Sequence, residues 1–334
     1  MFTSTLLLTE EMISFVKERF SDYLKQHLQL VKVSSPIAVL DGTGINDDLN
    51  GVERPVSFPI KSMGERRALV VHSLAKWKRV RLMELGVEDN MGILTDMHAL
   101  RPDEDYTNLH SIYVDQWDWE KRVSKESRNL SYLKETVESL YKTLKLTELD
   151  VYTRYGIEPS LPQNITFIHS QDLLDWYPNL TPKERENMAA KKDGAIFIVG
   201  IGGNLSNGAP HDLRAPDYDD WSTLNSDGHY GINGDIIVWH PKLNCAIELS
   251  SMGIRVDKEA LIRQLELRGC VDRKDLYFHK LLLNNLLPES IGGGIGQSRV
   301  CMFMLKRVHV GEVQVGIWSD YHRDQLKSQG VDLL

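Results

Sequence analysis

The segment GILTDMHALRPDEDYTNLHSIYVDQWDWE, residues 92–120, contains two strand-like runs that are joined by a polar loop. In both runs polar residues recur at every second position, a pattern typical of antiparallel strands with one wet face. The runs at 92–101 and 110–119 therefore predict a hairpin. Since a hairpin here interrupts strict βαβ alternation, the segment indicates an α+β fold with a mainly antiparallel sheet flanked by helices.

Amphipathic helices are predicted on both sides of this hairpin, because apolar residues recur with helical spacing in 9–28 and in 130–152. Shorter helices fit residues 75–85, 173–176, 182–189, 258–267 and 274–283. Further strand-like runs fit residues 68–74, 165–170, 195–200, 235–241, 244–251 and 313–318. No internal repeat or low-complexity linker interrupts the pattern, so residues 1–334 are expected to form a single domain.

The composition favours small-molecule chemistry. The 334 residues carry a formal net charge of −8, whereas a protein that holds long nucleic acid usually shows a basic face, so no nucleic-acid partner is expected. No run approaches the roughly 20 apolar residues of a membrane span, and no signal peptide is recognisable, so no membrane partner is expected either. The three cysteines are far apart in the chain, which predicts reduced thiols in a cytoplasmic protein.

The glycine-rich segment GGGIGQSR, residues 292–299, lacks the Lys-Ser/Thr pair of a P-loop and the third glycine of a dinucleotide fingerprint. Its glycines occupy alternate positions, Gly292, Gly294 and Gly296, and this spacing removes the side chains from one strand face. A flat ring could then lie against the backbone. Arg299, where the next helix is expected to begin, suits phosphate oxygens. The alternative is an ordinary glycine-rich turn.

The hairpin adds polar groups that suit a nucleotide and an amino acid. Arg101 ends the first strand and can make paired hydrogen bonds to phosphate, and Glu104 in the loop can accept from an exocyclic amine. Gln116 and Asp118 share one face of the second strand, since strand side chains alternate. Carboxylates and an amide suit a substrate with a cationic head. A solvated charged loop fits the neighbouring Asp103 and Asp105 better.

Two later segments are also rich in polar residues. RAPDYDDW, residues 214–221, places four aspartate and arginine side chains close together, and NCAIELSSMGIR, residues 244–255, puts a carboxylate on a core strand. Burying Glu248 is costly unless it meets a cation, and Mg²⁺ bound to nucleotide phosphates is the natural candidate. Asp235 is a second candidate ligand.

The order R-x-x-E on a hairpin and then G-x-G-x-G-x-x-R before a helix resembles motifs 2 and 3 of class II aminoacyl-tRNA synthetases. The longer strings VHSLAKWKR, ALRPDED, VDQWDWE, RAPDYDDWS, ELSSMGIRVD and IGGGIGQSR are similar to the ammonia-dependent asparagine synthetases, or aspartate–ammonia ligases, over essentially the whole chain. The resemblance implies a class II synthetase-like catalytic core and a homodimer that is built through the first helix and strand. It also implies that L-aspartate, ammonia and ATP give L-asparagine, AMP and pyrophosphate through a β-aspartyl-adenylate.

The resemblance further implies roles for individual residues. The catalytic set would be Arg101, Asp47, Gln116, Asp219 and Arg299, and the aspartate-binding set Ser73, Lys78, Asp118, Arg214 and Ser251. ATP would contact Arg101, Glu104, Ser111, Asp235, Glu248, Ser250, Gly294 and Arg299, with Mg²⁺ held by Asp235 and Glu248. Asp47 is followed by Asp48, and the sequence leaves open which of them closes over the substrate. It also leaves open whether Asp219 or Asp47 deprotonates ammonium.

Three further expectations complete the reading. Phe2, not cysteine, follows Met1, and no cysteine lies in a G-x-C-x-G turn, so free ammonia is favoured over glutamine as the nitrogen donor. Trp117, Trp119 and Trp221 are expected to wall the pocket, and His211 to belong to a mobile lid. The alternatives are a true aminoacyl-tRNA synthetase, which the acidic charge disfavours, and an inactive synthetase-like subunit, which the phosphate arginines and metal carboxylates disfavour.

Overall fold

The computed structural model describes residues 5–47 and 53–334, and Asp48 lies outside them. The helices are α1 (Thr5–Leu28), α2 (Ala75–Glu84), α3 (Leu130–Tyr155), α4 (Ser170–Trp176), α5 (Pro182–Asp193), α6 (Lys258–Leu267), α7 (Tyr277–Leu283), α8 (Gln297–Met304) and α9 (Asp320–Ser328). The strands are β1 (Leu30–Lys32), β2 (Ala38–Leu40), β3 (Ser57–Ile60), β4 (Arg66–Val70), β5 (Gly92–Leu100), β6 (Tyr113–Arg122), β7 (Thr166–His169), β8 (Ala195–Val199), β9 (Asn233–His240), β10 (Cys245–Ile254) and β11 (Ser290–Gly296).

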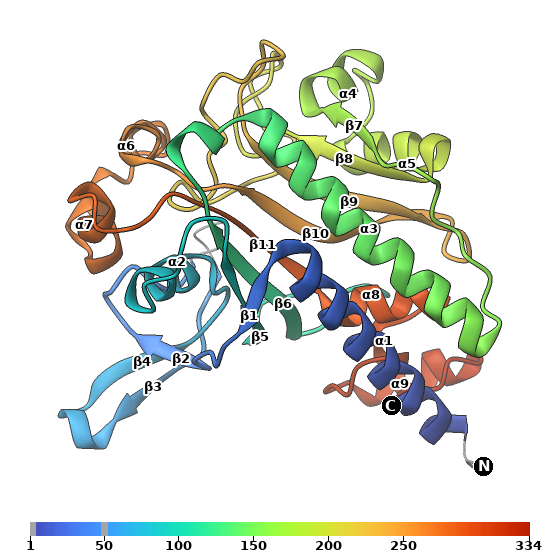
Figure 1. Cartoon of the computed structure of the whole chain (residues 1–334). Helices are drawn as coiled ribbons and strands as arrows, with labels where there is room; N and C mark the ends of the chain where they lie inside the picture. Colours follow the sequence, from blue (N-terminus) through green and yellow to red (C-terminus); the bar gives the residue numbers. More distant parts are fainter. Residues whose placement is uncertain (1–4, 48–52) are drawn as a thin grey trace.

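Eight of these strands form one sheet in the order β1-β5-β6-β11-β10-β9-β8-β7. The expected hairpin is present as β5 and β6, which pair in antiparallel register from Gly92–Lys121 to Leu100–Tyr113. The pairs β5-β6, β6-β11, β11-β10, β10-β9 and β9-β8 are antiparallel, and so are both pairs of the small β2-β4-β3 sheet. That small sheet projects from the body in Figure 1.

The large sheet is mixed, which corrects the expectation of a mainly antiparallel one. Both edge pairs, β1 with β5 and β7 with β8, run parallel. A connection that contains helices joins the two strands of each pair. Helix α2 lies between β1 and β5 in the chain, and α4 and α5 lie between β7 and β8. The sequence pattern predicted these helices but not which strands pair across them, because strand pairing between distant segments is set by tertiary packing. The run 313–318 was also expected to be a strand and forms none.

Helices α1, α3 and α8 cover one face of the sheet, and α1 and α3 lie side by side across it in Figure 1. Phe20 of α1 stacks on Trp117 of β6 with ring centroids 4.4 Å apart. Trp117 and Trp119 are both buried in this core, with 1% and 0% of their surfaces exposed. They therefore stabilise the packing of α1 on the sheet, and the expectation that they wall the pocket is wrong.

The other face of the sheet carries α2, which packs against β6 and β11. Because strand side chains alternate, the residues of β6 that alternate with the tryptophans, such as Asp118, point toward α2 and not toward α1. This is the face on which the polar residues of the hairpin gather. No helix in the described part of the chain is long and apolar enough to cross a membrane.

Candidate active site

A cavity of about 490 Å³ lies on the α2 face of the sheet, a size that suits a small-molecule site. Its wall combines β6, β10 and β11 with the loops before α2 and before β9. Most residues predicted from the sequence line it, namely Asp47, Ser73, Lys78, Arg101, Glu104, Ser111, Gln116, Asp118, Arg214, Asp219, Glu248, Ser251, Gly294 and Arg299. Asp235 and Ser250 do not. Tertiary structure thus brings together segments that are up to about 250 residues apart.

The alternate glycines of β11 make room for side chains of β6. Gly292 pairs with Glu120 and Gly294 with Asp118. A Cβ atom on Gly292 would lie 1.9 Å from Glu120 Oε2, and one on Gly294 would lie 2.5 Å from the Gln116 side-chain oxygen. Protein side chains therefore fill the space over Gly292 and Gly294, which corrects the expectation of a strand face left bare for a flat ring.

Lys78 of α2 enters the cavity as a buried cation. Its Nζ contacts the Asp118 carboxylate and donates to the carbonyl of Gly293 at 2.9 Å. Burial lowers the pKa of the Lys78 ammonium, and the nearby Arg255 acts in the same direction, whereas Asp118 opposes the change. Lys78 and Asp118 therefore form a desolvated ion pair whose strength depends on both partners remaining in place.

Arg255, the last residue of the polar segment 244–255, lies between two carboxylates. Its Nε donates to Glu120 at 3.0 Å, its Nη2 donates to Glu120 at 2.8 Å, and its Nη1 contacts Asp219. Burial alone would raise the pKa of Glu120, but Arg255 reverses this and holds it below its ordinary value. Burial raises the pKa of Asp219 in spite of the same arginine. Strand alternation from Gln116 and Asp118 could have identified Glu120 in advance.

Asp235 lies behind Arg214, which does line the cavity. Arg214 Nη2 donates to both carboxylate oxygens of Asp235 at 2.6 Å and to Ser251 Oγ at 3.1 Å. Burial raises the pKa of Asp235 to about 7, and the nearby Glu248 carboxylate adds to the shift. Excess negative charge at this point fits a cation between Asp235 and Glu248.

Among the described residues, no group of three or more His, Cys, Asp or Glu side chains could hold a metal ion unaided. Mg²⁺ commonly takes only one or two carboxylates and completes its coordination with phosphate oxygens and water. The pair Asp235 and Glu248 therefore fits a Mg²⁺ ion that arrives with a nucleotide.

Ser250 does not reach the cavity. The register of β10 shifts between Glu248 and Ser250, so Glu248 and Ser251 share the face of the cavity and Ser250 takes the opposite one. Its neighbours in register, Ile236 and Ile295, belong to the hydrophobic core. The prediction of an ATP contact at Ser250 therefore does not match the structure, because the irregularity breaks simple alternation.

Two guanidinium groups of the cavity are only lightly engaged. Arg101 Nη2 donates to the His72 carbonyl at 3.3 Å, and its Nε is buried without a partner. Within the described residues Arg101 forms no ion pair. Arg299 donates to the Glu248 carbonyl at 3.2 Å and to His110 Nε2 at 2.8 Å, with the Glu248 carboxylate 3.9 Å away. Such cations are available for an anionic ligand.

His110, which is not among the residues predicted for the site, orients Arg299. Burial lowers the pKa of His110 to about 4, and Arg299 adds to the shift. The ring is therefore neutral near pH 7 and accepts from Arg299 through Nε2. The proton on Nδ1 then faces Thr107 Oγ1 at 2.8 Å. A histidine in the turn between two strands gave no distinctive signal in the sequence.

The remaining predicted residues are each buried or held by contacts with other parts of the chain. Asp47 is buried, and its carbonyl lies 3.2 Å from His72 Nδ1. The Ser111 hydroxyl is 2.6 Å from the side-chain oxygen of Gln314, so its wall position is supported by the C-terminal segment. His211 is buried, and its Nε2 lies 3.3 Å from Glu186 Oε1; its place in a mobile lid stays a prediction. Trp221 is likewise buried and does not line the cavity.

Known proteins resemble this chain over nearly its whole length. The family model described as aspartate-ammonia ligase matches residues 7–330. An aspartate–ammonia ligase of Parabacteroides distasonis is 54% identical over 327 residues, which cover 98% of this chain and 95% of that protein.

Solved structures show the same fold at low sequence identity. The asparaginyl-tRNA synthetase of Pyrococcus horikoshii complexed with asparaginyl-adenylate superposes with a TM-score of 0.66 at 15% identity, over 92% of this chain and 68% of that one. The asparaginyl-tRNA synthetase of Entamoeba histolytica in complex with asparaginyl-adenylate gives 0.65 at 13% identity, over 92% and 66%.

Proposed function

The chain belongs to the aspartate–ammonia ligase family, and from that premise we propose how the residues of its cavity divide the reaction between them. Its activity is the ligation of L-aspartate and ammonia at the expense of ATP.

The reaction proceeds through a β-aspartyl-adenylate. A carboxylate does not react with ammonia at neutral pH, because its leaving group would be an oxide. Attack of the β-carboxylate on the α-phosphorus of ATP releases pyrophosphate and gives a mixed anhydride with AMP as its leaving group. The observation that supports this route is the lightly engaged Arg101, whose buried Nε lacks a partner inside the same cavity as the Lys78 and Arg255 clusters. The synthetase neighbours hold asparaginyl-adenylate on the same fold.

ATP and aspartate contact different residues of the cavity. Arg101 stabilises charge on the α-phosphate, and Arg299, held by His110, steadies the departing pyrophosphate. Glu104 faces the adenine amine and Gln116 the reacting carboxylate. The aspartate substrate is surrounded by Ser73, Lys78, Asp118, Arg214 and Ser251.

Ammonia enters the second half of the reaction as a nucleophile. Ammonium first loses a proton, and the nitrogen lone pair then attacks the β-carbonyl carbon. AMP is expelled as the C–N bond replaces the C–O bond of the anhydride, and a second proton leaves the nitrogen to give the neutral amide. Asp219 suits the role of proton acceptor because burial raises its pKa toward the range in which a general base works well. Asp47 is the alternative acceptor, since it lines the same cavity.

Mg²⁺ would be held by Asp235 and Glu248 together with phosphate oxygens of ATP, and when bound it would neutralise part of the phosphate charge. Burial is the main cause that raises the pKa of Asp235, and the Glu248 carboxylate lies close enough to add to the shift; this proximity of two carboxylates supports the assignment. Arg214 is then the protein cation that balances Asp235 from the side of the cavity.

The assembly proposed for this enzyme is a homodimer through the first helix and strand. β1 is an edge strand of the large sheet, and Val31 within it and Ile37 beyond its end are 56% and 67% exposed. Phe58 of the small sheet adds another exposed apolar side chain. We propose one catalytic domain, since the large sheet draws strands from residues 30 to 296, and a cytoplasmic location, which suits ATP as substrate and three free cysteines.

An end-point assay tests the chemistry. The enzyme is incubated with ATP, Mg²⁺, L-aspartate and ammonium, each is omitted in turn, and the amino-acid and nucleotide products are identified. We expect asparagine together with AMP and pyrophosphate only when all four are present. Arg101→Met should lower kcat/KM by roughly 10²–10³-fold without unfolding the protein. Formation of ADP and phosphate would replace the adenylate by an acyl phosphate.

A further inference from the structure

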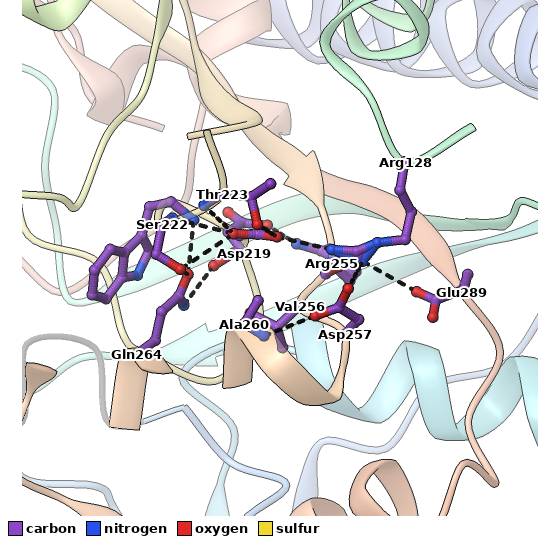
Figure 2. Close-up of polar contacts among 12 residues, drawn as sticks. Arg128, Asp219, Ser222, Thr223, Arg255, Val256, Asp257, Ala260, Gln264 and Glu289 are labelled. Carbon is purple, nitrogen blue, oxygen red and sulfur yellow. Dashed lines mark hydrogen bonds and ion pairs between the residues drawn. The ribbon is translucent and has the colours of Figure 1, made fainter. Parts of the chain in front are cut away.

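A buried polar cluster behind the cavity holds the segment that carries Asp219 (Figure 2). On one side of this segment lies Gln264 of α6, whose side chain is fully buried. None of its members outside the Asp219–Arg255 pair lines the cavity, and none is used in the chemistry above. They act on the site only through the backbone that they hold.

Gln264 uses all four of its hydrogen-bonding positions on this one segment. Its Nε2 donates to the carbonyls of Pro216 and Asp219 at 2.8 and 3.0 Å. Its Oε1 accepts from the Trp221 backbone N–H and from Ser222 Oγ, both at 2.9 Å. An amide that meets the backbone on both sides of Asp219 fixes where that carboxylate points.

Arg128 holds the same segment from the other side. Its Nη2 donates to the Asp220 carboxylate at 2.8 Å, and its Nη1 donates to the carbonyl of Arg255 at 3.2 Å. Asp220 in turn accepts from the backbone of Ser222 and Thr223 at 3.1 and 3.0 Å. The Arg128 guanidinium therefore links Asp220, the neighbour of Asp219 in the chain, to the backbone of Arg255, which is the ion-pair partner of Asp219.

The backbone of β10 completes the support. Asp219 and Arg255 form an isolated antiparallel bridge, and Asp220 N–H donates to the Ile254 carbonyl at 2.9 Å. Gly253 is needed here, because a Cβ atom on it would lie 2.9 Å from Asp219 Oδ1. The carboxylate thus stands in a space that is bounded by β10 and fixed from behind by Gln264 and Arg128.

We propose that Gln264 and Arg128 are positioning residues that set the Asp219–Arg255 pair for the aspartate and ammonia steps. This inference rests on the proposed function, in which Asp219 works on the amino-acid side of the cavity. A misplacement of about 1 Å at a reacting group can cost up to 10²-fold in rate. Phosphate contacts depend on Arg101 and Arg299, which the cluster does not touch, so ATP binding is not affected.

The test compares Gln264→Met and Arg128→Lys with a matched control, Ser222→Ala. The control removes the contacts of Ser222 Oγ with Gln264 Oε1, Asp220 Oδ1 and Arg263 Nε but leaves both bonds of Gln264 to the Pro216 and Asp219 carbonyls. We expect kcat/KM for aspartate to fall by roughly 10–10²-fold in Gln264→Met. Arg128→Lys, which keeps the charge beside Asp220 but not the planar fork, should show a smaller fall. KM for ATP should stay within about twofold in both variants, and Ser222→Ala should resemble the wild type.

The outcomes separate positioning from folding. Melting curves and circular dichroism establish that each variant is folded at the assay temperature, and if Gln264→Met does not fold, Arg128→Lys carries the test. Wild-type kinetics in a folded Arg128→Lys and Gln264→Met would overturn the proposal. So would an equal loss for aspartate and ATP, because that indicates general loosening of the site. Failure of the proposed function would appear differently, as the absence of asparagine and AMP with the wild-type enzyme.

Discussion

Replacing Gly292 by alanine should destabilise the protein, because the space above this residue is occupied by a buried ion pair. The added Cβ atom would lie 1.9 Å from Glu120 Oε2 and 2.6 Å from Arg255 Nη2. Both distances are shorter than any contact a methyl group tolerates. The pair must therefore move, although three nitrogen–oxygen contacts and Ser290 Oγ at 2.7 Å now hold Glu120 in place.

The magnitude follows from the burial of both partners. Glu120 is 0% exposed and Arg255 is 2% exposed, so neither charge can turn to water when the pair is forced apart. Removing one partner of a buried pair costs about 3–5 kcal/mol, whereas alanine in a strand is favoured over glycine by about 0.5–1 kcal/mol. The net loss in the free energy of unfolding is then on the order of 2–4 kcal/mol.

Thermal unfolding followed by circular dichroism measures this loss. At roughly 2 °C per kcal/mol for a larger chain, Gly292→Ala should melt several degrees below the wild type. Gly296→Ala is the matched control in the same strand, since the three atoms nearest to its Cβ atom would be Arg299 side-chain carbons at 3.4–3.6 Å, which is ordinary van der Waals contact. The control should melt at or slightly above the wild-type temperature. If both variants melted together, the assignment of the space over Gly292 to the Glu120–Arg255 pair would be refuted.

Three further predictions concern pH, metal and assembly. The pKa of His110 is about 4 in the folded protein and 6.5 ordinarily, so the contribution of the neutral ring to stability is complete above pH 6.5 and is lost as the pH falls toward 4. In urea titrations between about pH 7 and 5, His110→Gln should therefore lose less stability than the wild type. An equal loss would argue against the neutral, buried ring. Chelation of Mg²⁺ should stop asparagine formation, and Glu248→Gln should need more Mg²⁺ for half-maximal rate; an unchanged requirement would exclude Glu248 as a ligand. Light scattering should give twice the 38.2 kDa of one chain, and Ile37→Asp should shift the mass toward the monomer, whereas a wild-type monomer would contradict the dimer.

Local patterns in the sequence were enough to predict the long helices, the central hairpin and part of the cavity wall, and the family resemblance supplied other predicted residues that line it, such as Ser73 and Lys78. Helical spacing identified α1, α3 and α6, and alternation placed Gln116 and Asp118 on one strand face. Short runs were less informative. Residues 313–318 alternate like a strand and form none, and α9 was not predicted at all.

The misses in the site have physical causes that no local pattern contains. The register shift in β10 reverses the facing of Ser250 relative to Glu248, and alternation alone cannot reveal it. Trp117 and Trp119 border acidic residues in the sequence, but α1 packs over their face of the sheet and takes them into the core. His110 has an ordinary sequence context and gains its role only because Arg299, 189 residues away in the chain, lies 2.8 Å from it.

The sequence by itself determined the chemical inventory of this protein, its α+β class and the family to which it belongs, because these depend on residue types and on spacing over a few turns or strands. Only the tertiary structure decided that the sheet is mixed, that Arg255 stands between Glu120 and Asp219, and that Gln264 and Arg128 support this pair from behind. Such relations join residues that are about 35 to 135 positions apart. They arise when whole elements pack together and bury charges that must find partners, which fixes each partner by geometry and desolvation and not by sequence neighbourhood.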